Sequence, residues 1–238
     1  RAPEYAIRTE ISRNPEPGNS KDPDAGPGTA SDTGSCVRKY PVGKDAVEHI
    51  REMETAYRNL TERYRGGNLE INRCRLKEEG EQVHIEFEFV KGTPLSALCL
   101  ERNDQEGFLR LFEEYLERIG YNSEYPAADY DLTFSNILVD GERWTLIDYE
   151  WTFGKQVETR ELAFRAIYCY LLEDEKRNKL NLDSILRVLK ITEEEAEEFR
   201  EQERGFQAFV SGKRMVMGQI WELIGNKSFL RNIGKRNG

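Results

Sequence analysis

The residues best suited to chemistry are acids and one amide placed around a short predicted hairpin. Asp131 and Asn136 stand five residues apart. Asp148 and Glu150 follow after two apolar, strand-like runs that flank an Asp-Gly turn at 140–141, which is a strong hairpin signal. Two like charges about 4 Å apart repel by roughly 4 kcal/mol at an effective dielectric near 20. The cluster therefore requires a cation or a proton, and its oxygen-only donors favour Mg²⁺ over zinc.

This arrangement resembles the catalytic residues of kinase-like phosphotransferases, in their small-molecule branch of choline and aminoglycoside kinases. The run Asp131-Leu132-Thr133-Phe134-Ser135-Asn136 is similar to their catalytic loop, and 146–151 is similar to the Ile-Asp-Phe-Glu-Tyr stretch of choline kinases. The resemblance implies that Asp131 orients and deprotonates the attacking hydroxyl. It also implies that Asn136 and Asp148 hold Mg²⁺ beside ATP, with Glu150 as an outer or second metal ligand.

One position departs from the family pattern. The family usually has His two residues before the catalytic Asp, whereas this chain has Asp129. That His is mainly a structural tie in the family, so its replacement leaves the base in place. Asp129 is, however, an alternative candidate for the base.

Composition limits the classes of protein that the chain can belong to. It has 238 residues, 33% of them charged and 38% hydrophobic, with a net charge of −9. This acidic balance argues against a nucleic-acid or membrane-surface binder. No apolar run approaches the ~20 residues that span a bilayer. The four cysteines are scattered, which predicts reduced thiols in a cytoplasmic protein. Because the sequence opens on Arg1, we expect it to be part of a longer multidomain chain.

Alternation of apolar residues predicts a small N-terminal sheet with one helix. We expect strands at 4–11, 36–42, 69–76 and 83–90, and a helix over 45–65 that begins with an Asp45–Glu48 capping box. Residues 13–35 are rich in Pro, Gly, Ser and Asp and predict a flexible insertion between two strands. The alternative is that this segment replaces a glycine-rich phosphate flap, although no GxGxxG spacing is present.

Lys39 and Glu54 are predicted to form an ion pair that places the lysine on the nucleotide. Lys39 resembles the strand lysine that holds the α- and β-phosphates in kinases. Glu54 falls on the apolar stripe of the 45–65 helix, and a buried carboxylate needs a partner. The alternative is a Glu at the edge of the stripe that extends to water.

The end of the 83–90 strand resembles the hinge of aminoglycoside and choline kinases. There the backbone contacts adenine, so the resemblance assigns this contact to Glu88, Phe89 and Val90. Neither histidine has a companion at ligand spacing, and both His49 and His84 are therefore discounted as metal or acid–base residues.

The rest of the chain is predicted to be helical. Apolar residues at 3–4 spacing predict helices over 104–119 and 161–172, a short one over 183–190, and one of some thirty residues that Thr192 and Glu195 cap. Arg160 and Arg165 are expected to brace the catalytic loop, to reach an acceptor phosphate or to form surface ion pairs. The apolar tail 215–224 is expected to pack on these helices or to lead into a neighbouring domain.

Together these features predict an α+β, two-lobed, protein-kinase-like fold. The N-lobe comprises 1–90, and the helical C-lobe comprises 91–238 with the catalytic hairpin at 129–151. The resemblance implies transfer of a phosphoryl group from ATP to a hydroxyl of a small molecule or glycan. Kinase domains associated with bacterial O-antigen synthesis are similar too, which points to cell-surface polysaccharides.

Two other functions remain open at this point. A pseudokinase that binds nucleotide or is empty, and that regulates a fused glycan-synthesis enzyme, is favoured by Asp129 and by the missing glycine-rich loop. Retention of Lys39, Asp131, Asn136 and Asp148 opposes it. A purely helical interaction module would require the hairpin resemblance to be chance.

Overall fold

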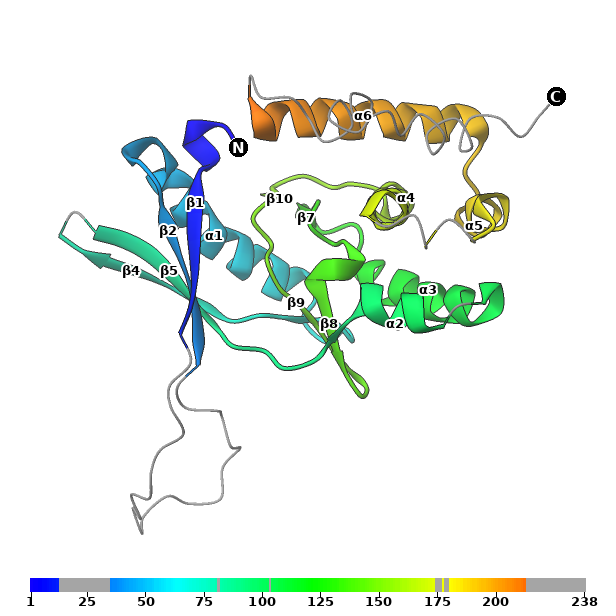
Figure 1. Cartoon of the computed structure of the whole chain (residues 1–238), viewed down its shortest axis with the longest axis horizontal. Helices are drawn as coiled ribbons and strands as arrows, with labels where there is room; N and C mark the ends of the chain where they lie inside the picture. The colour runs from blue at the N-terminus through cyan, green and yellow to red at the C-terminus, as the bar shows by residue number, and fades with distance from the viewer. Residues whose placement is uncertain (13–34, 81, 103, 174–176, 178–179, 213–238) are drawn as a thin grey trace, which may run out of the picture.

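The computed structural model describes residues 1–12, 35–80, 82–102, 104–173, 177 and 180–212, and these residues form an α+β structure. An antiparallel sheet with one helix comes first, and a mixed sheet and a set of helices follow (Figure 1). Most of the predicted insertion (13–34) and the apolar tail (215–224) lie outside the described residues. No helix in the described part of the chain combines the length and the apolar character that a membrane crossing needs.

The N-terminal sheet has the strand order β1-β2-β5-β4, and all neighbouring strands are antiparallel. Its strands are β1 (Ile7–Ser12), β2 (Cys36–Pro41), β4 (Cys74–Glu79) and β5 (Gln82–Glu88). The strand predicted over 4–11 begins late, because Pro3–Tyr5 form a turn of 3-10 helix (η1). Proline suits the first position of such a turn because its φ is already helical.

The predicted strand over 69–76 is wrong in one respect, because the chain divides it between two sheets. β3 (Glu70–Ile71) pairs in parallel with β9 (Arg143–Leu146), whereas β4 joins the N-terminal sheet. The second sheet has the order β3-β9-β8-β6, with β6 (Thr93–Pro94) and β8 (Ile137–Asp140). The segment between β3 and β4 thus joins the two sheets.

α1 (Val47–Arg63) packs against the N-terminal sheet and buries Ile50, Met53 and Leu60 in the core. The predicted Asp45–Glu48 capping box is wrong. Lys44–Ala46 form a 3-10 turn (η2), and no side chain caps the helix. In this turn the amides of Ala46 and Val47 donate to backbone carbonyls, so they need no side-chain cap.

The helices of the second half follow the predicted apolar periodicity closely. They are α2 (Leu95–Glu101), α3 (Gln105–Ile119), α4 (Thr159–Glu173), α5 (Leu182–Leu189) and α6 (Glu193–Ser211). Thr192 and Glu195 form the predicted capping box of α6. The thirty-residue length predicted for this helix extends beyond the described residues, and α2 was not predicted.

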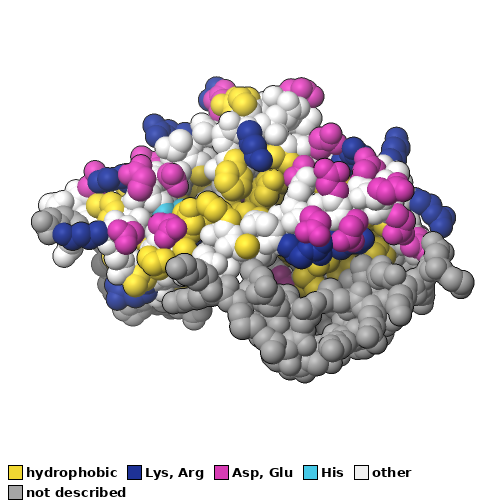
Figure 2. Space-filling view, turned by 90° about the horizontal axis from the view of Figure 1, so that it is seen from above, with side chains coloured by type: hydrophobic (Ala, Val, Ile, Leu, Met, Phe, Trp, Pro, Cys, Tyr) yellow, Lys and Arg dark blue, Asp and Glu magenta, His cyan; other side chains and the backbone are white. Residues whose placement is uncertain are grey.

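α6 brings the C-terminal end of the described chain back to its N-terminal segment. It runs along one side of the molecule above α4 and ends near the N-terminus (Figure 1). There the amide of Ala2 donates to the Val210 carbonyl at 2.9 Å. Seen from this side, apolar side chains gather near the centre, and acidic and basic side chains crowd the end where α6 begins (Figure 2). α6 therefore contacts both the helical half and the N-terminal segment.

Candidate active site

The predicted hairpin forms and returns Asn136 to the neighbourhood of Asp148. β8 and β9 pair in antiparallel register from Asp140↔Arg143 to Ile137↔Leu146. Gly141 has φ 60 in the turn, a conformation that glycine adopts without steric cost. Beyond the strands, the amide of Ile147 donates to the Asn136 carbonyl at 2.8 Å. Asn136 is thus hydrogen-bonded to the residue directly before Asp148, as the sequence predicts.

The loop that carries Asp131 is fixed by hydrogen bonds to its backbone. The carbonyl of Asp131 accepts a hydrogen bond from Asn136 Nδ2 at 3.0 Å, so the Asn136 side-chain oxygen takes no part in this bond. The hydroxyl of Tyr115 on α3 donates to the Leu132 carbonyl at 2.6 Å. Phe134 is buried among aromatic rings that include Tyr115, at 4.9 Å between ring centroids. The loop is therefore held on the helical half.

Arg165 braces the same loop from α4. Its Nη1 donates to the carbonyl of Tyr130, and its Nε donates to Glu203 on α6 at 2.6 Å. Of the roles considered for the two arginines, bracing the loop is therefore the one that Arg165 performs. Arg160 instead pairs with Glu158 and Glu195 at the surface.

Asp129 is fully buried and links the Asp131 loop to the strand that follows Asp148. β7 (Ala128–Asp129) pairs with β10 (Thr152–Phe153). The Asp129 Oδ1 atom accepts from the Asp131 amide and from the Thr152 hydroxyl, both at 3.2 Å. The other oxygen, Oδ2, is buried and has no hydrogen-bond partner. These contacts give Asp129 a structural role, whatever its protonation state.

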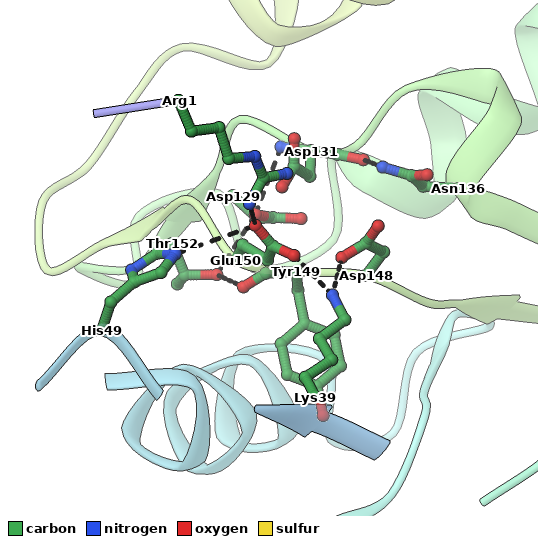
Figure 3. A network of polar contacts seen from close by, with 10 residues as sticks. All are labelled: Arg1, Lys39, His49, Asp129, Asp131, Asn136, Asp148, Tyr149, Glu150 and Thr152. Atoms are coloured by element: carbon green, nitrogen blue, oxygen red, sulfur yellow. Dashed lines mark hydrogen bonds and ion pairs between the residues drawn. The ribbon is translucent and has the colours of Figure 1, made fainter. Parts of the chain in front are cut away.

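The predicted ion pair between Lys39 and Glu54 is wrong. Lys39 Nζ lies between Asp148, with which it forms an ion pair, and Glu150 Oε1 at 2.6 Å (Figure 3). Glu54 instead accepts a long hydrogen bond, 3.4 Å, from the amide of Leu76 on β4. The half-buried carboxylate of Glu54 does find a partner, as a buried acid requires, but that partner is backbone of the neighbouring strand.

Burial gives the acids of this cluster unusual proton affinities. Burial raises the pKa of Asp129 to about 7. Burial, followed by the charges of Asp129 and Asp148, raises the pKa of Asp131 well above its ordinary value. Burial also raises the pKa of Asp148, although Lys39 opposes this effect. Burial is the largest cause in each case, because removal of water makes the charged form of a carboxylate costly.

Asp148 combines solvent access with an uncommon backbone conformation. Its side chain is 43% exposed, in contrast to those of its neighbours Lys39 and Glu150. Its φ is 56, in the left-handed region that few non-glycine residues occupy. Such conformations are concentrated at functional sites, where the surrounding structure holds them in place.

The donor set fits Mg²⁺ with few protein ligands. Among the described residues, no three His, Cys, Asp or Glu side chains already surround a common metal position. Mg²⁺ commonly uses one or two carboxylates and takes its remaining oxygens from phosphates and water. The Asp148 side chain is accessible from solvent, and burial and the neighbouring charge of Glu150 raise its pKa against the effect of Lys39. Asp148 is therefore a suitable ligand, whereas the Asn136 amide is hydrogen-bonded through Nδ2 to the Asp131 carbonyl with its oxygen directed away from Asp148 (Figure 3), and its role as a ligand stays a prediction.

Glu150 lies deeper than Asp148 and faces cationic side chains. Its side chain is 2% exposed, Oε1 contacts Lys39, and Oε2 pairs with Arg1 (Figure 3). Burial alone would raise the pKa of Glu150, but His49, Lys39 and Arg1 together lower it below its ordinary value. A metal-binding role for Glu150 stays a prediction.

The predicted adenine-binding segment lies where β5 ends. Glu88 is the last residue of β5 and is exposed, and Phe89 and Val90 follow it outside the strand, half-buried. Gly92 then passes close to β8, because a Cβ at this position would lie 3.1 Å from the Val139 carbonyl oxygen. Glycine thus permits the close approach, and the adenine contact stays a prediction.

Two buried residues near the site were missed in the sequence. Arg63 is fully buried and donates to the carbonyls of Ala127 and Ile119, which ties α1 to the segment before β7. His49 is 3% exposed and lies against Glu150. Helical spacing indicates that both side chains lie on the buried face of α1, since His49 precedes Met53 by four residues and Arg63 follows Leu60 by three.

Comparison of the sequence with models of known protein families gives no match, and comparison with curated proteins gives no significant match. Functional conclusions therefore depend on the residues and on their geometry.

Proposed function

We propose that this chain has a two-lobed, kinase-like fold and transfers the γ-phosphoryl group of ATP to a hydroxyl of a small molecule or glycan. One observation carries the proposal. Lys39 of the N-terminal sheet meets Asp148, the acid after the β8–β9 hairpin, and Asn136 at the start of that hairpin bonds the Asp131 loop. The acids and the amide lie within 131–148, and the lysine comes to them from a distant part of the sequence.

The arrangement of secondary structure supports the same fold. An antiparallel sheet with one helix stands beside a helical half, and residues 89–92 connect β5 to β6 and the helices. On this proposal the nucleotide binds between the two halves, with its adenine against the backbone of 88–90. Lys39 faces the phosphates.

Each polar residue then has a role that its surroundings support. Asp131, on a loop fixed at both ends, orients the acceptor hydroxyl and takes its proton. Mg²⁺, held by Asp148 and Asn136, supplies the positive charge that phosphoryl transfer requires. The raised pKa of Asp131 means that positive charge at the site would favour the ionised base. Catalysis would arise mainly from positioning and charge neutralisation.

A pseudokinase is the second candidate, and one observation favours it. Lys39 and Asp148 neutralise each other directly, so part of the charge that would bind a nucleotide and a metal is already satisfied within the chain. A regulatory scaffold can keep the Lys39–Asp148 ion pair as it is. An enzyme has to exchange the Lys39–Asp148 contact for contacts with phosphate and metal.

Two measurements separate these functions. Thermal-shift titration with ATP, with and without Mg²⁺, reports whether a metal–nucleotide site exists. Transfer of radiolabel from γ-labelled ATP to a panel of sugars, amino alcohols and glycans then reports catalysis. An enzyme shows Mg²⁺-dependent stabilisation and a labelled product, whereas a nucleotide-binding scaffold shows stabilisation alone. Absence of both responses would contradict the proposed function.

A further inference from the structure

We propose that Glu150 is the residue that positions Lys39, in the role that the sequence assigns to Glu54 of α1. The inference rests on the proposed function, since Lys39 is taken to face the nucleotide phosphates. It names a positioning residue that lies two places after the metal-binding Asp148, on the chain segment that leads to β10.

The contact itself is short and shielded from solvent. Lys39 Nζ lies 2.6 Å from Glu150 Oε1, and the two side chains are 6% and 2% exposed. The ring of Phe87 lies beneath the lysine, 5.5 Å from Nζ. The attraction between two charges is stronger away from water, and removal of one partner of a buried pair is costly because the other charge is left without compensation.

Glu150 is held in place from behind. Its second oxygen pairs with Arg1 and lies 3.7 Å from His49 Nε2 (Figure 3). The His49 ring packs against Tyr5 and Trp151, at centroid distances of 5.3 and 4.9 Å. The carboxylate is therefore held by Arg1 and by His49 of α1, whose ring packs against Tyr5 and Trp151, and it can fix Lys39 in turn.

The two acids beside Lys39 differ in how easily they can leave it. Asp148 is 43% exposed and is the proposed metal ligand, so it is free to exchange the lysine for a metal ion. Glu150 is enclosed and has cationic neighbours on both oxygens. When Asp148 turns to a metal, Glu150 remains as the counter-ion that keeps Lys39 charged and in place.

Glu54 cannot perform this function in the described structure. Its Oε1 accepts from the amide of Leu76, on the strand at the far edge of the sheet from β1. Lys39 lies on β2, and β5 separates β2 from that strand. Glu54 of α1 thus contacts the edge strand β4, whereas Glu150, which follows the hairpin, contacts Lys39.

The test compares three variants that each remove one negative charge: Glu150→Gln, Glu54→Gln and, as a control at an exposed helical position, Glu62→Gln. Calorimetric titration with MgADP measures their affinities. We expect Glu150→Gln to weaken binding by about tenfold or more, since a buried charge loses its partner. Glu54→Gln and Glu62→Gln should stay within about twofold of the unmodified chain.

A double variant distinguishes positioning of Lys39 from general damage. In a Lys39→Met background, Glu150→Gln should weaken MgADP binding by no more than about twofold, because the residue through which it acts is gone. An equal loss of affinity with and without Lys39 would overturn the proposal. If Glu150→Gln fails to fold, Glu150→Asp keeps the charge but shortens the side chain, and the same comparison applies.

A measurement without nucleotide separates this inference from the proposed function. Proton–nitrogen correlation NMR of the lysine ammonium groups shows the Lys39 signal, which Lys39→Met identifies. We expect Glu150→Gln to shift or remove that signal and Glu54→Gln to leave it unchanged. The reverse result would refute the positioning role. A chain that shows the expected NMR result but binds no MgADP would refute the phosphotransferase proposal alone.

Discussion

At the scale of single residues, the site is defined by acids that lack enough positive charge. Asp129, Asp131 and Asp148 all have a raised pKa, and burial is the largest cause in each case. Arg165 opposes this effect at Asp129 and Asp131, and Lys39 opposes it at Asp148. A bound cation would therefore lower the free energy of the whole cluster, and each acid should respond differently to removal of its charge.

Replacing Asp148 with Asn should abolish phosphotransfer while the protein remains folded. Asn tolerates the left-handed backbone of this position better than Ala would. Loss of the carboxylate removes the proposed metal ligand, and we expect the rate to fall by at least about a hundredfold. Steady-state assays with labelled ATP measure the rate, and circular dichroism checks the fold. Asp140→Asn, at the exposed hairpin turn, is the matched control. Undiminished phosphotransfer by Asp148→Asn would exclude the assigned role.

Asp129 should make the protein less stable as pH rises from about 4 to 7. Its folded pKa, about 7, lies above the ordinary value of 3.8. Between these values the folded chain keeps the proton and the unfolded chain has lost it, so the free energy of unfolding decreases with pH. The stability that protonated Asp129 contributes is fully present below the lower value and is lost as pH rises through the upper one.

Asp129→Asn removes this titration and should flatten the pH dependence. The difference in the free energy of unfolding between the variant and the unmodified chain should change with pH. From pH 5 to pH 8 we expect it to shift in favour of the variant by roughly 1–3 kcal/mol, because one pKa unit corresponds to about 1.4 kcal/mol. Urea unfolding at the two pH values measures the difference. Asp140→Asn again provides the exposed control. An equal effect of Asp129→Asn at both pH values would show that Asp129 does not titrate in this range.

At the scale of elements, the β8–β9 hairpin sets the spacing of the site. Its register determines that Asn136 and Ile147 share a backbone hydrogen bond, and this brings the loop residues next to Asp148. The turn at Gly141 makes this register accessible, because its φ of 60 strains any residue with a Cβ.

Gly141→Ala should destabilise the protein by about 1 kcal/mol through backbone strain alone. No atom lies within 4 Å of a Cβ placed at Gly141, so the substitution causes no collision. Gly154→Ala is the matched control, since that position is equally open and its φ is not in the left-handed region. Thermal or urea unfolding of both variants gives the comparison. Equal stabilities would mean that the turn tolerates a side chain.

At the level of the whole molecule, α6 and the N-terminal segment form a further connection between the two halves of the structure. The chain itself passes between the halves at 89–92 and between β3 and β4. The further connection is an aromatic cluster that brings together Tyr5 of η1, Trp151 near the site, and Phe206 and Phe209 of α6. The cluster also packs His49, which lies against Glu150, so α6 supports the site indirectly.

Phe206→Ala should weaken this connection. Phe206 is half-buried and contacts the rings of Trp151, Tyr130 and Phe153. Since a fully buried Phe→Ala costs about 3–5 kcal/mol, we expect roughly half of that here. Phe209→Ala, at a 52% exposed position of the same helix, should cost less. Urea unfolding gives the stabilities, and hydrogen exchange should show faster opening of 1–12 and α1 in both variants, because Phe209 packs on Tyr5 and Phe206 packs on Trp151, which contacts Tyr5 and His49. Unchanged exchange in these segments would argue against the connection.

Features that depend on neighbouring residues could be predicted from the sequence. The Asp-Gly turn, the alternation of β5, the apolar stripe of α3 and the Thr192–Glu195 capping box all use interactions over a few residues. Backbone conformation and side-chain periodicity control such features, so residue types and spacing were enough to predict them. For the candidate site this was sufficient to place Asn136 beside the start of the Asp148 segment.

Contacts between groups that are far apart in the chain could be assigned only from the folded structure. Lys39 and Glu54 were within plausible reach on adjoining elements, yet Lys39 turns to Asp148 and Glu150. The division between β3 and β4 has the same origin, because β3 pairs with a strand beyond α3. Such contacts depend on how whole elements pack, and burial strengthens charge pairing only after packing has removed the water.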